Sequence, residues 1–201
     1  MLADIFISHY MEKYGHKTDG NTLQVHELSA CRRKRVCRRK WYRLGVEELM
    51  SVKPSIVIGE LIHEGLSTIL SKHGYIPDVE ARKAIEVDGK VYEIIGHADL
   101  VKKDTVYEIK YARQVKRHAL QHHRVQVSLY KWLLNVDKAV IIYFTPDETT
   151  MYRVDGAVGD GWVKSHIRQW MTRTPLFSWE CTYCPYRDLC RLSFPAENGR
   201  R

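Results

Sequence analysis

The stretch Ile94–Tyr111, IIGHADLVKKDTVYEIKY, constrains the fold most, because it places charged side chains inside two short apolar segments. The segments are joined by a polar turn, a pattern that predicts a β-hairpin. Asp99 lies in the first strand, and Glu108 and Lys110 lie in the second. Because strand side chains alternate between faces, Glu108 and Lys110 point the same way. Unpaired charges in apolar strands are costly, which indicates a site rather than a scaffold.

The register of this hairpin decides what the acids can do. A two-residue turn at Lys103-Asp104 places Asp99 opposite Glu108, with Cβ atoms about 5 Å apart. Two carboxylates at that distance repel each other unless a cation lies between them, and their oxygen atoms suit Mg²⁺ or Mn²⁺. Lys-Asp lacks the Asn-Gly signature of a favoured turn, so the register is a hypothesis. The interpretation requires both acids to lie on one side of the sheet.

The order of elements predicts an α/β (α+β) fold with a central mixed sheet flanked by helices. Hydrophobic residues make up 44% of the 201, enough for the core of one domain. Expected strands besides this hairpin are Val79–Val87 and Val91–Val101 around an Asp88-Gly89 turn, 138–146, and an edge strand at 149–154. Expected helices lie at 54–74, 116–135 and 158–171, and Ser29 is a possible helix start.

Two of these helices carry polar residues of interest. The 54–74 helix has an apolar stripe and should pack on the core, with His63 just off the stripe. The stripe consists of Ile58, Leu61, Ile62, Leu66, Ile69 and Leu70. A lone histidine in that position is more often structural than a ligand. In the 116–135 helix, Gln126 and Tyr130 are four residues apart and share a face, although Tyr130 alone would be an ordinary half-buried aromatic.

The charge distribution favours a polyanionic partner. The formal net charge is +8 with ten further histidines. Between positions 31 and 40 lie Arg32, Arg33, Lys34, Arg35, Arg38, Arg39 and Lys40. Trp41 and Tyr42 follow and could stack on bases, so the run is interpreted as a nucleic-acid surface, with a solvated helix face as the alternative. No apolar run is long enough to span a membrane and no secretion signal is recognisable, so no membrane partner and a cytoplasmic location are expected.

The five cysteines lie near the two ends of the sequence. Cys31 and Cys37 come first, and Cys181, Cys184 and Cys190 come last. In a cytoplasmic protein this argues against a disulfide framework. Four thiolates could hold an iron-sulfur cluster or tetrahedral zinc, and either would cross-link the two ends and order residues 175–201.

The acidic pair and its neighbours permit phosphodiester hydrolysis. A divalent cation on Asp99 and Glu108 would polarise a phosphate and lower the pKa of a bound water. Lys110 could position that water or neutralise charge on the phosphoryl oxygens. The competing interpretation is that Glu-x-Lys is only an ion pair.

The ordered motifs resemble the RecB-like branch of the PD-(D/E)xK nucleases, with its restriction-endonuclease-like fold. They are GELIHEGL with His63, GHADLV with Asp99, YEIKYAR with Glu108 and Lys110, and QVSLYKWLL with Gln126 and Tyr130. More specifically, the chain resembles the fourth CRISPR-associated (Cas) family of small RecB-type exonucleases. The resemblance spans Leu28 to Cys190 and includes the cysteine layout.

This resemblance implies a role for each site residue. His63, Asp99, Glu108 and the backbone carbonyl of Ile109 would ligate Mn²⁺ or Mg²⁺. Lys110 would be the catalytic lysine, and Gln126 and Tyr130 would orient the site and the DNA backbone. An iron-sulfur cluster, 4Fe-4S rather than 2Fe-2S, would be held by Cys31, Cys181, Cys184 and Cys190. Cys37 is a departure from the family pattern and leaves the N-terminal ligand open.

The resemblance also implies a substrate and a setting. The family cuts single-stranded DNA, typically 5′ to 3′, and acts in CRISPR spacer acquisition beside the Cas integrase. We expect a single nuclease domain over 1–201, with a core at 55–172 and a cluster-binding, DNA-channel part formed by 1–50 and 175–201. Two alternatives stay open: an iron-stapled RecB-like repair nuclease, and a non-catalytic, metal-stapled DNA-binding module.

Overall fold

The computed structural model describes residues 5, 8, 20–38, 40, 54–114 and 117–190. Its centre is a mixed six-stranded sheet in the order β1-β3-β4-β5-β6, with β2 paired to β3. The strands are β1 (Thr22–Gln24), β2 (Ile76–Val87), β3 (Lys90–Lys102), β4 (Thr105–Tyr111), β5 (Lys138–Phe144) and β6 (Thr149–Arg153). The helices are α2 (Val25–Leu28), α4 (Pro54–Ser71), α5 (Gln121–Leu134) and α6 (Asp160–Thr172), with 3₁₀ turns η1 (Glu180–Tyr183) and η2 (Arg187–Leu189). The predicted fold class is confirmed.

The sheet is built around two hairpins that share β3. At the first turn, Asp88 and Gly89 both adopt left-handed backbone angles, φ 52° and 76°, as the predicted Asp-Gly turn requires. At the second, Lys103 has φ 55° and Lys102 lies opposite Thr105. The register continues to Leu100 opposite Tyr107, so the predicted register is confirmed for this part of the hairpin.

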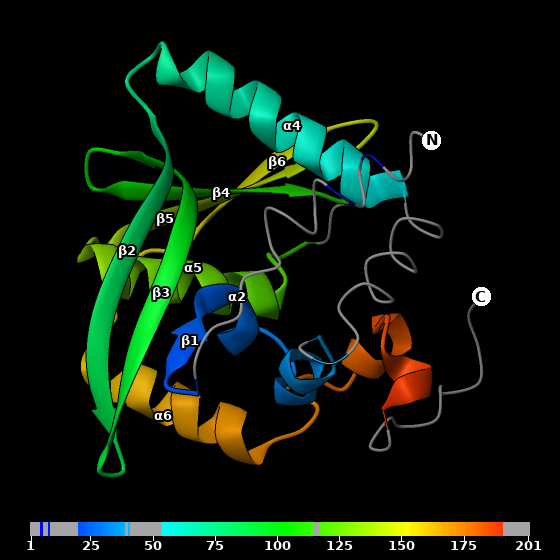
Figure 1. Ribbon diagram of the computed structural model, residues 1–201. Helices are drawn as coiled ribbons and strands as arrows, with labels where there is room; N and C mark the ends of the chain where they lie inside the picture. The colour runs from blue at the N-terminus through cyan, green and yellow to red at the C-terminus, as the bar shows by residue number, and fades with distance from the viewer. Residues whose placement is uncertain are drawn as a thin grey trace.

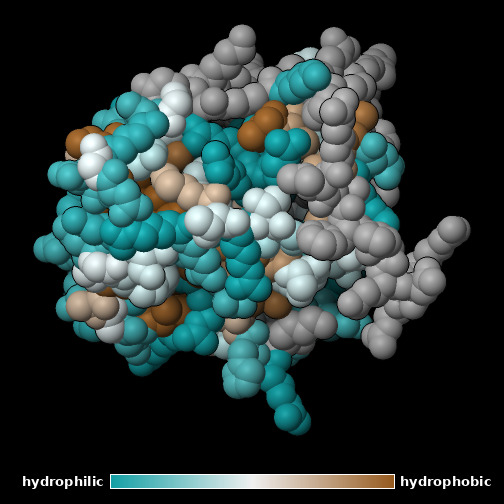
Figure 2. Space-filling view, turned by 90° about the horizontal axis from the view of Figure 1, so that it is seen from below, coloured by the Kyte–Doolittle hydropathy of each residue, from teal (hydrophilic) through white to brown (hydrophobic). Residues whose placement is uncertain are grey.

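Helices cover the sheet on two sides. Figure 1 shows α4 above the sheet and α5, α2 and α6 below it. Helix α5 connects β4 to its parallel neighbour β5 and supplies core residues such as Val127, Leu129 and Trp132. It begins at Gln121, later than expected, because Leu120 is extended and its N–H donates to the hydroxyl of Tyr143. The surface seen from below in Figure 2 is mostly hydrophilic, with apolar side chains in small separate patches.

The segment before residue 30 differs from the prediction. Ser29 does not begin a helix but caps the end of α2, and residues 32–38 form the next helical stretch. Strand β1 was not predicted; it runs parallel to β3 beside Glu93–Ile95. Both elements are too short for periodicity to reveal them. Glu27 stabilises the start of α2 by accepting the backbone N–H of Gln24 at 3.2 Å.

Helix α4 packs less deeply than its apolar stripe predicted. Leu61 and Ile69 are 61% and 56% exposed, and Ile58 is also exposed. Ile62, Leu66 and Leu70 are half-buried. The stripe spans about half of the helix circumference at ~100° per residue, which is wider than the side that meets the sheet. The helix therefore packs against β4 and β2 as predicted, but only part of its apolar stripe makes this contact.

Within the described part of the chain, no helix combines the length and hydropathy needed to cross a membrane.

Candidate active site

The two acids lie where β3 and β4 separate. The paired register ends at Leu100 and Tyr107, so Asp99 and Glu108 stand one position beyond it. Asp99 Oδ2 accepts the backbone N–H of Ile109 at 2.7 Å, which joins the two strands through a side chain at this point. The acids are close enough for the charge of Asp99 to affect the pKa of Glu108. Both therefore face the same region, as the hairpin prediction required.

His63 reaches this region from α4. Its Nε2 lies 3.4 Å from Asp99 Oδ1, and both side chains are about one-fifth exposed. On a helical projection, His63 falls beside Ile62, Leu66 and Leu70, on the side of α4 that meets the sheet. Considered alone, the sequence of this helix favoured a structural role for His63. The structure instead places the His63 imidazole beside Asp99.

Glu108 is a buried acid with a raised pKa. Its side chain is 1% exposed, and burial together with the charge of Asp99 raises its pKa to about 7, although Lys110 and His63 act in the opposite direction. The Lys110 ammonium contacts Oε1, whereas Oε2 has no hydrogen-bond donor among the described residues. A buried carboxylate oxygen without a donor is expensive unless a further cation binds there.

Lys110 remains an ammonium in this environment. Burial lowers its pKa, but the charges of Glu108 and Asp99 outweigh burial, so the pKa lies above its ordinary value. The side chain is only one-quarter exposed and also lines the cavity described below. It therefore presents a fixed positive charge beside the acids.

Gln126 and Tyr130 meet as neighbours on α5. Gln126 Nε2 donates to the Tyr130 hydroxyl at 3.2 Å. Tyr130 is 5% exposed, and burial with the charges of Glu108 and Asp99 raises its pKa well above 10, so it stays a neutral phenol. Its ring packs so closely on Gly96 that a Cβ there would lie 2.7 Å from Cε1. Tyr130 is placed to support the site from within, whereas the expected contact to a DNA backbone does not fit its burial.

The donors for a hard cation are present but not assembled. No three histidine, cysteine, aspartate or glutamate side chains among the described residues stand in a metal-binding arrangement. The residues nevertheless fit such an ion, because Glu108 Oε2 is buried without a donor, and Asp99 and His63 lie beside it. Oxygen donors with one imidazole suit Mn²⁺ or Mg²⁺.

The basic run is divided between two faces of the helical stretch 32–38. Arg33 and Lys34 line the same cavity as Lys110. Arg32 lies on the other side, and its Nη1 donates to the carbonyl of Met171 at 2.8 Å. Arg38 contacts His26 Nε2 at 2.7 Å, and Lys40 is exposed. Arg39, Trp41 and Tyr42 lie outside the described residues.

Arg35 is a correction to the predicted DNA surface. It is 9% exposed, its Nε lies 3.3 Å from Glu27 Oε2, and its Nη2 donates to the carbonyl of Thr22 at 2.8 Å. These contacts hold α2, β1 and the basic helix together, because a buried guanidinium needs paired partners. Arg35 is therefore structural.

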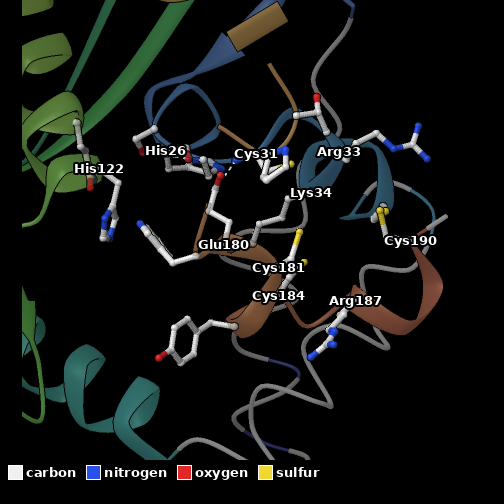
Figure 3. Close-up of a pocket in the computed structure, with 18 of the residues that line it drawn as sticks. His26, Cys31, Arg33, Lys34, His122, Glu180, Cys181, Cys184, Arg187 and Cys190 are labelled. Carbon is white, nitrogen blue, oxygen red and sulfur yellow. Dashed lines mark hydrogen bonds between the residues drawn. The ribbon is translucent and has the colours of Figure 1, made fainter. Parts of the chain in front are cut away.

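All five cysteines line one cavity of about 370 Å³, shared by the N-terminal and C-terminal segments. Figure 3 labels four of them, Cys31, Cys181, Cys184 and Cys190. All five are free thiols. Burial raises the pKa of Cys37, and the neighbouring Cys190 raises it further. Burial likewise raises the pKa of Cys31, with Cys181 among its neighbours. The fold thus gathers the thiols at one place, while a four-cysteine cluster stays a prediction and the choice between Cys31 and Cys37 stays open.

Several cavity residues were not singled out from the sequence. They are Glu180, His122, Trp179, Tyr183 and Arg187. Figure 3 shows Glu180 between His122 on α5 and the thiols of Cys181 and Cys184. The aromatic and cysteine-rich character of FSWECTYC was the available signal, but without periodicity it gave no orientation.

Comparison with known proteins gives two full-length similarities. The chain is 29% identical to the CRISPR-associated exonuclease Cas4 of Saccharolobus solfataricus over 199 residues, covering 94% of this chain and 98% of that protein. It matches the crystal structure of SSO0001 with a TM-score of 0.87 and 28% identity, over 97% of this chain and 98% of that one. No family model matches. The predicted family resemblance is confirmed.

A fainter likeness concerns the alkaline exonuclease from Laribacter hongkongensis. It has a TM-score of 0.48 and 10% identity, over 75% of this chain and 86% of that one.

Proposed function

We propose that this homologue of the CRISPR-associated exonuclease Cas4 is a metal-dependent DNA exonuclease that degrades single-stranded DNA, 5′ to 3′, by phosphodiester hydrolysis. The observation that carries the proposal is the buried Glu108 carboxylate, with its raised pKa and an Oε2 that no described residue satisfies, beside Asp99, His63 and Lys110. Burying such a carboxylate costs free energy and does not stabilise the fold, whereas a hydrolytic site can use it to bind a cation.

The cation would be held by His63, Asp99, Glu108 and the backbone carbonyl of Ile109. When bound, Mn²⁺ or Mg²⁺ would polarise the scissile phosphate and acidify a water molecule. The Ile109 N–H already fixes Asp99 Oδ2, so the other oxygen of Asp99 is directed toward His63. The orientation of the Asp99 carboxylate is thereby set before any ion binds.

Lys110 supplies a permanent positive charge at the reacting phosphate. Because the acids keep its pKa high, it cannot act as the base at neutral pH but can stabilise charge that develops on the phosphoryl oxygens. Gln126 reaches the cavity from α5, and its amide is positioned by Tyr130. Tyr130 acts through Gln126 and is a positioning residue.

The cysteines would hold an iron-sulfur cluster, 4Fe-4S in preference to 2Fe-2S, through Cys31, Cys181, Cys184 and Cys190. Zinc in the same thiolates is the alternative. The support is that these thiols line one cavity although they come from opposite ends of the sequence. Arg33 and Lys34 in that cavity would guide the strand toward Lys110.

The biological setting follows from the relative alone. A CRISPR-associated exonuclease at 29% identity supports processing of DNA ends in spacer acquisition, beside the Cas integrase. A repair nuclease of the same fold is the alternative, and genomic neighbourhood separates the two.

The test is cleavage of single-stranded DNA labelled at either end, with Mn²⁺ or Mg²⁺, by the wild type and Lys110→Ala. We expect the variant to lose cleavage while keeping DNA affinity measured in EDTA. Lys138→Ala is the matched control, because Lys138 also pairs with an acid, Asp104, at 2.7 Å but stands at the other end of its strand. It should cleave like the wild type. A wild type that binds DNA yet never cleaves it with either metal would identify a non-catalytic binding module.

A further inference from the structure

Aromatic rings form one wall of the cavity that also contains Lys110. Trp179 is 41% exposed and lies 4.7 Å from His122, measured between ring centroids. Tyr183 is 63% exposed and lies 6.4 Å from Trp179. Phe177 stacks behind Trp179 at 5.9 Å with an interplanar angle of 11°. We call Trp179, Tyr183 and His122 the aromatic wall.

Contacts with neighbouring side chains hold the wall from behind. His122 packs against His123 at 3.9 Å between ring centroids with the rings tilted by 53°, and His123 Nδ1 lies 2.6 Å from the Tyr143 hydroxyl of β5. Phe177 is buried and its N–H donates to Glu180 Oε2 at 2.8 Å. The Trp179 ring is therefore backed by Phe177 and, through His122 and His123, by the sheet, while Tyr183 lies beside it on η1.

Positive charge surrounds the wall on the same cavity. Arg33, Lys34 and Arg187 line it together with Lys110, and Gln126 connects it to the catalytic region. Figure 3 shows Lys34 and Arg187 extending near the thiol-bearing segment, with His122 across the cavity. Burial and the nearby Lys110 and Lys34 charges lower the pKa of His122 to about 4, so it is a neutral ring at pH 7. His122 is thus suited to stacking rather than to binding phosphate.

Exposed rings beside cations match the chemistry of single-stranded nucleic acid. Bases stack on aromatic faces while the backbone follows the positive charges, and only unpaired bases expose both faces. We propose that Trp179 and Tyr183, backed by His122, form a base-stacking platform that holds one or two nucleotides of a single strand next to the catalytic lysine. This inference rests on the proposed nuclease function, because it assigns DNA to the cavity. It also gives the site its preference for single strands over duplexes.

The platform is tested by binding, in EDTA, of fluorescein-labelled oligothymidine and of an abasic oligomer of equal length. Trp179→Ala should weaken oligothymidine binding about fivefold to a hundredfold and leave abasic binding unchanged. Trp179→Phe should keep most of the affinity. Trp162→Ala is the control, because Trp162 is equally exposed at 41% and stacks on a histidine, His166, but lies on α6 and outside the cavity lining.

Two outcomes would overturn the platform. One is unchanged oligothymidine binding by Trp179→Ala, and the other is an equal loss on both oligomers, which would mean a general change in the fold or in charge. Tyr183→Ala, at the most exposed ring of the wall, provides a second variant that should keep the fold and show the same selective loss. Binding is measured without free metal and so does not depend on catalysis. Failure of the wild type to cleave in the separate assay with Mn²⁺ or Mg²⁺ would refute the nuclease and leave the platform standing.

Discussion

The carboxylate of Glu180 accepts the backbone N–H of Cys31 at 2.6 Å, across 149 residues of sequence. Its second oxygen accepts the N–H of Phe177 at 2.8 Å, and the side chain is 8% exposed. Glu180 directly precedes Cys181. The two cysteine-bearing segments are therefore joined by a charge-assisted hydrogen bond beside the cavity that the thiols line, even before any metal is considered.

Replacement Glu180→Gln should loosen that link. An amide keeps one acceptor oxygen but turns an NH₂ group toward a backbone donor, so we expect a loss of about 2 kcal/mol in the free energy of unfolding. For a chain of this size that lowers Tm by about 4–8 °C. Calorimetry measures the Tm of the variant, with Glu86→Gln, which changes an exposed acid of β2, as the control. Equal melting of both variants would show that the link contributes nothing.

The thiol site makes a second prediction. Cys184→Ser should lose the visible absorption and metal content of the purified protein and melt at a lower temperature, since binding energy of a structural metal centre is folding energy. Cys31→Ser should behave alike, whereas Cys37→Ser should retain the metal if Cys31 is the N-terminal ligand. Elemental analysis distinguishes iron from zinc. A Cys184→Ser protein with full metal content and unchanged melting would remove this role.

The central hairpin and its chemistry were predictable from sequence because the Asp-Gly turn is a strong local signal and the strand alternation agrees with it. The Asp88-Gly89 and Lys103-Asp104 turns fix the register of β2, β3 and β4, and alternation then fixes the face of Glu108 and Lys110. The motif order supplied His63, which lies in a helix far from the acids in sequence. Proximity of His63 to Asp99 is a tertiary property that periodicity cannot provide.

The errors have the opposite cause, because they concern segments whose environment is set by distant parts of the chain. In the sequence, Arg35 is one of seven cations between positions 31 and 40. In the fold, its side chain is buried and pairs with Glu27. Leu61 and Ile69 belong to an apolar stripe that predicts core packing, but both are exposed because the sheet contacts a different part of the α4 surface. Trp179 lies in a stretch without periodicity, so its place beside His122 emerges only from the fold. Arrangement in space, not composition, separates these cases.

The division of the basic helix makes a third prediction. Arg33→Ala should weaken single-stranded DNA binding and reduce the dependence of log K on log salt by about 0.7, as expected for one lost phosphate contact on a single strand. Arg32→Ala, on the opposite side of the same helix and bonded to Met171, should change neither. Affinity measured from low to moderate salt gives the slopes. Equal effects of the two variants would mean that the cavity is not the DNA path.

The buried acid makes the final prediction, on metal-free protein. The pKa of Glu108 is about 7 in the folded chain against an ordinary 4.5, so the folded state holds a proton that the unfolded chain releases. Its contribution to stability is complete below pH 4.5 and is lost as pH rises to about 7. Glu108→Gln has no such loss. The free energy of unfolding of Glu108→Gln minus that of the wild type should therefore rise by up to a few kcal/mol across this pH window and stay constant at higher pH.

Other histidines of lowered pKa, such as His122 and His26, are present in both proteins and cancel in this difference. Denaturant unfolding in EDTA at pH values from 4.5 to 8 measures it, and Glu86→Gln should run parallel to the wild type. Saturating Mn²⁺ should then stabilise the wild type and not Glu108→Gln, because the ion binds the ionised carboxylate only in the folded state. Curves that stay parallel without metal would show that Glu108 ionises as an ordinary surface acid, and the cation site would lose the support of its raised pKa.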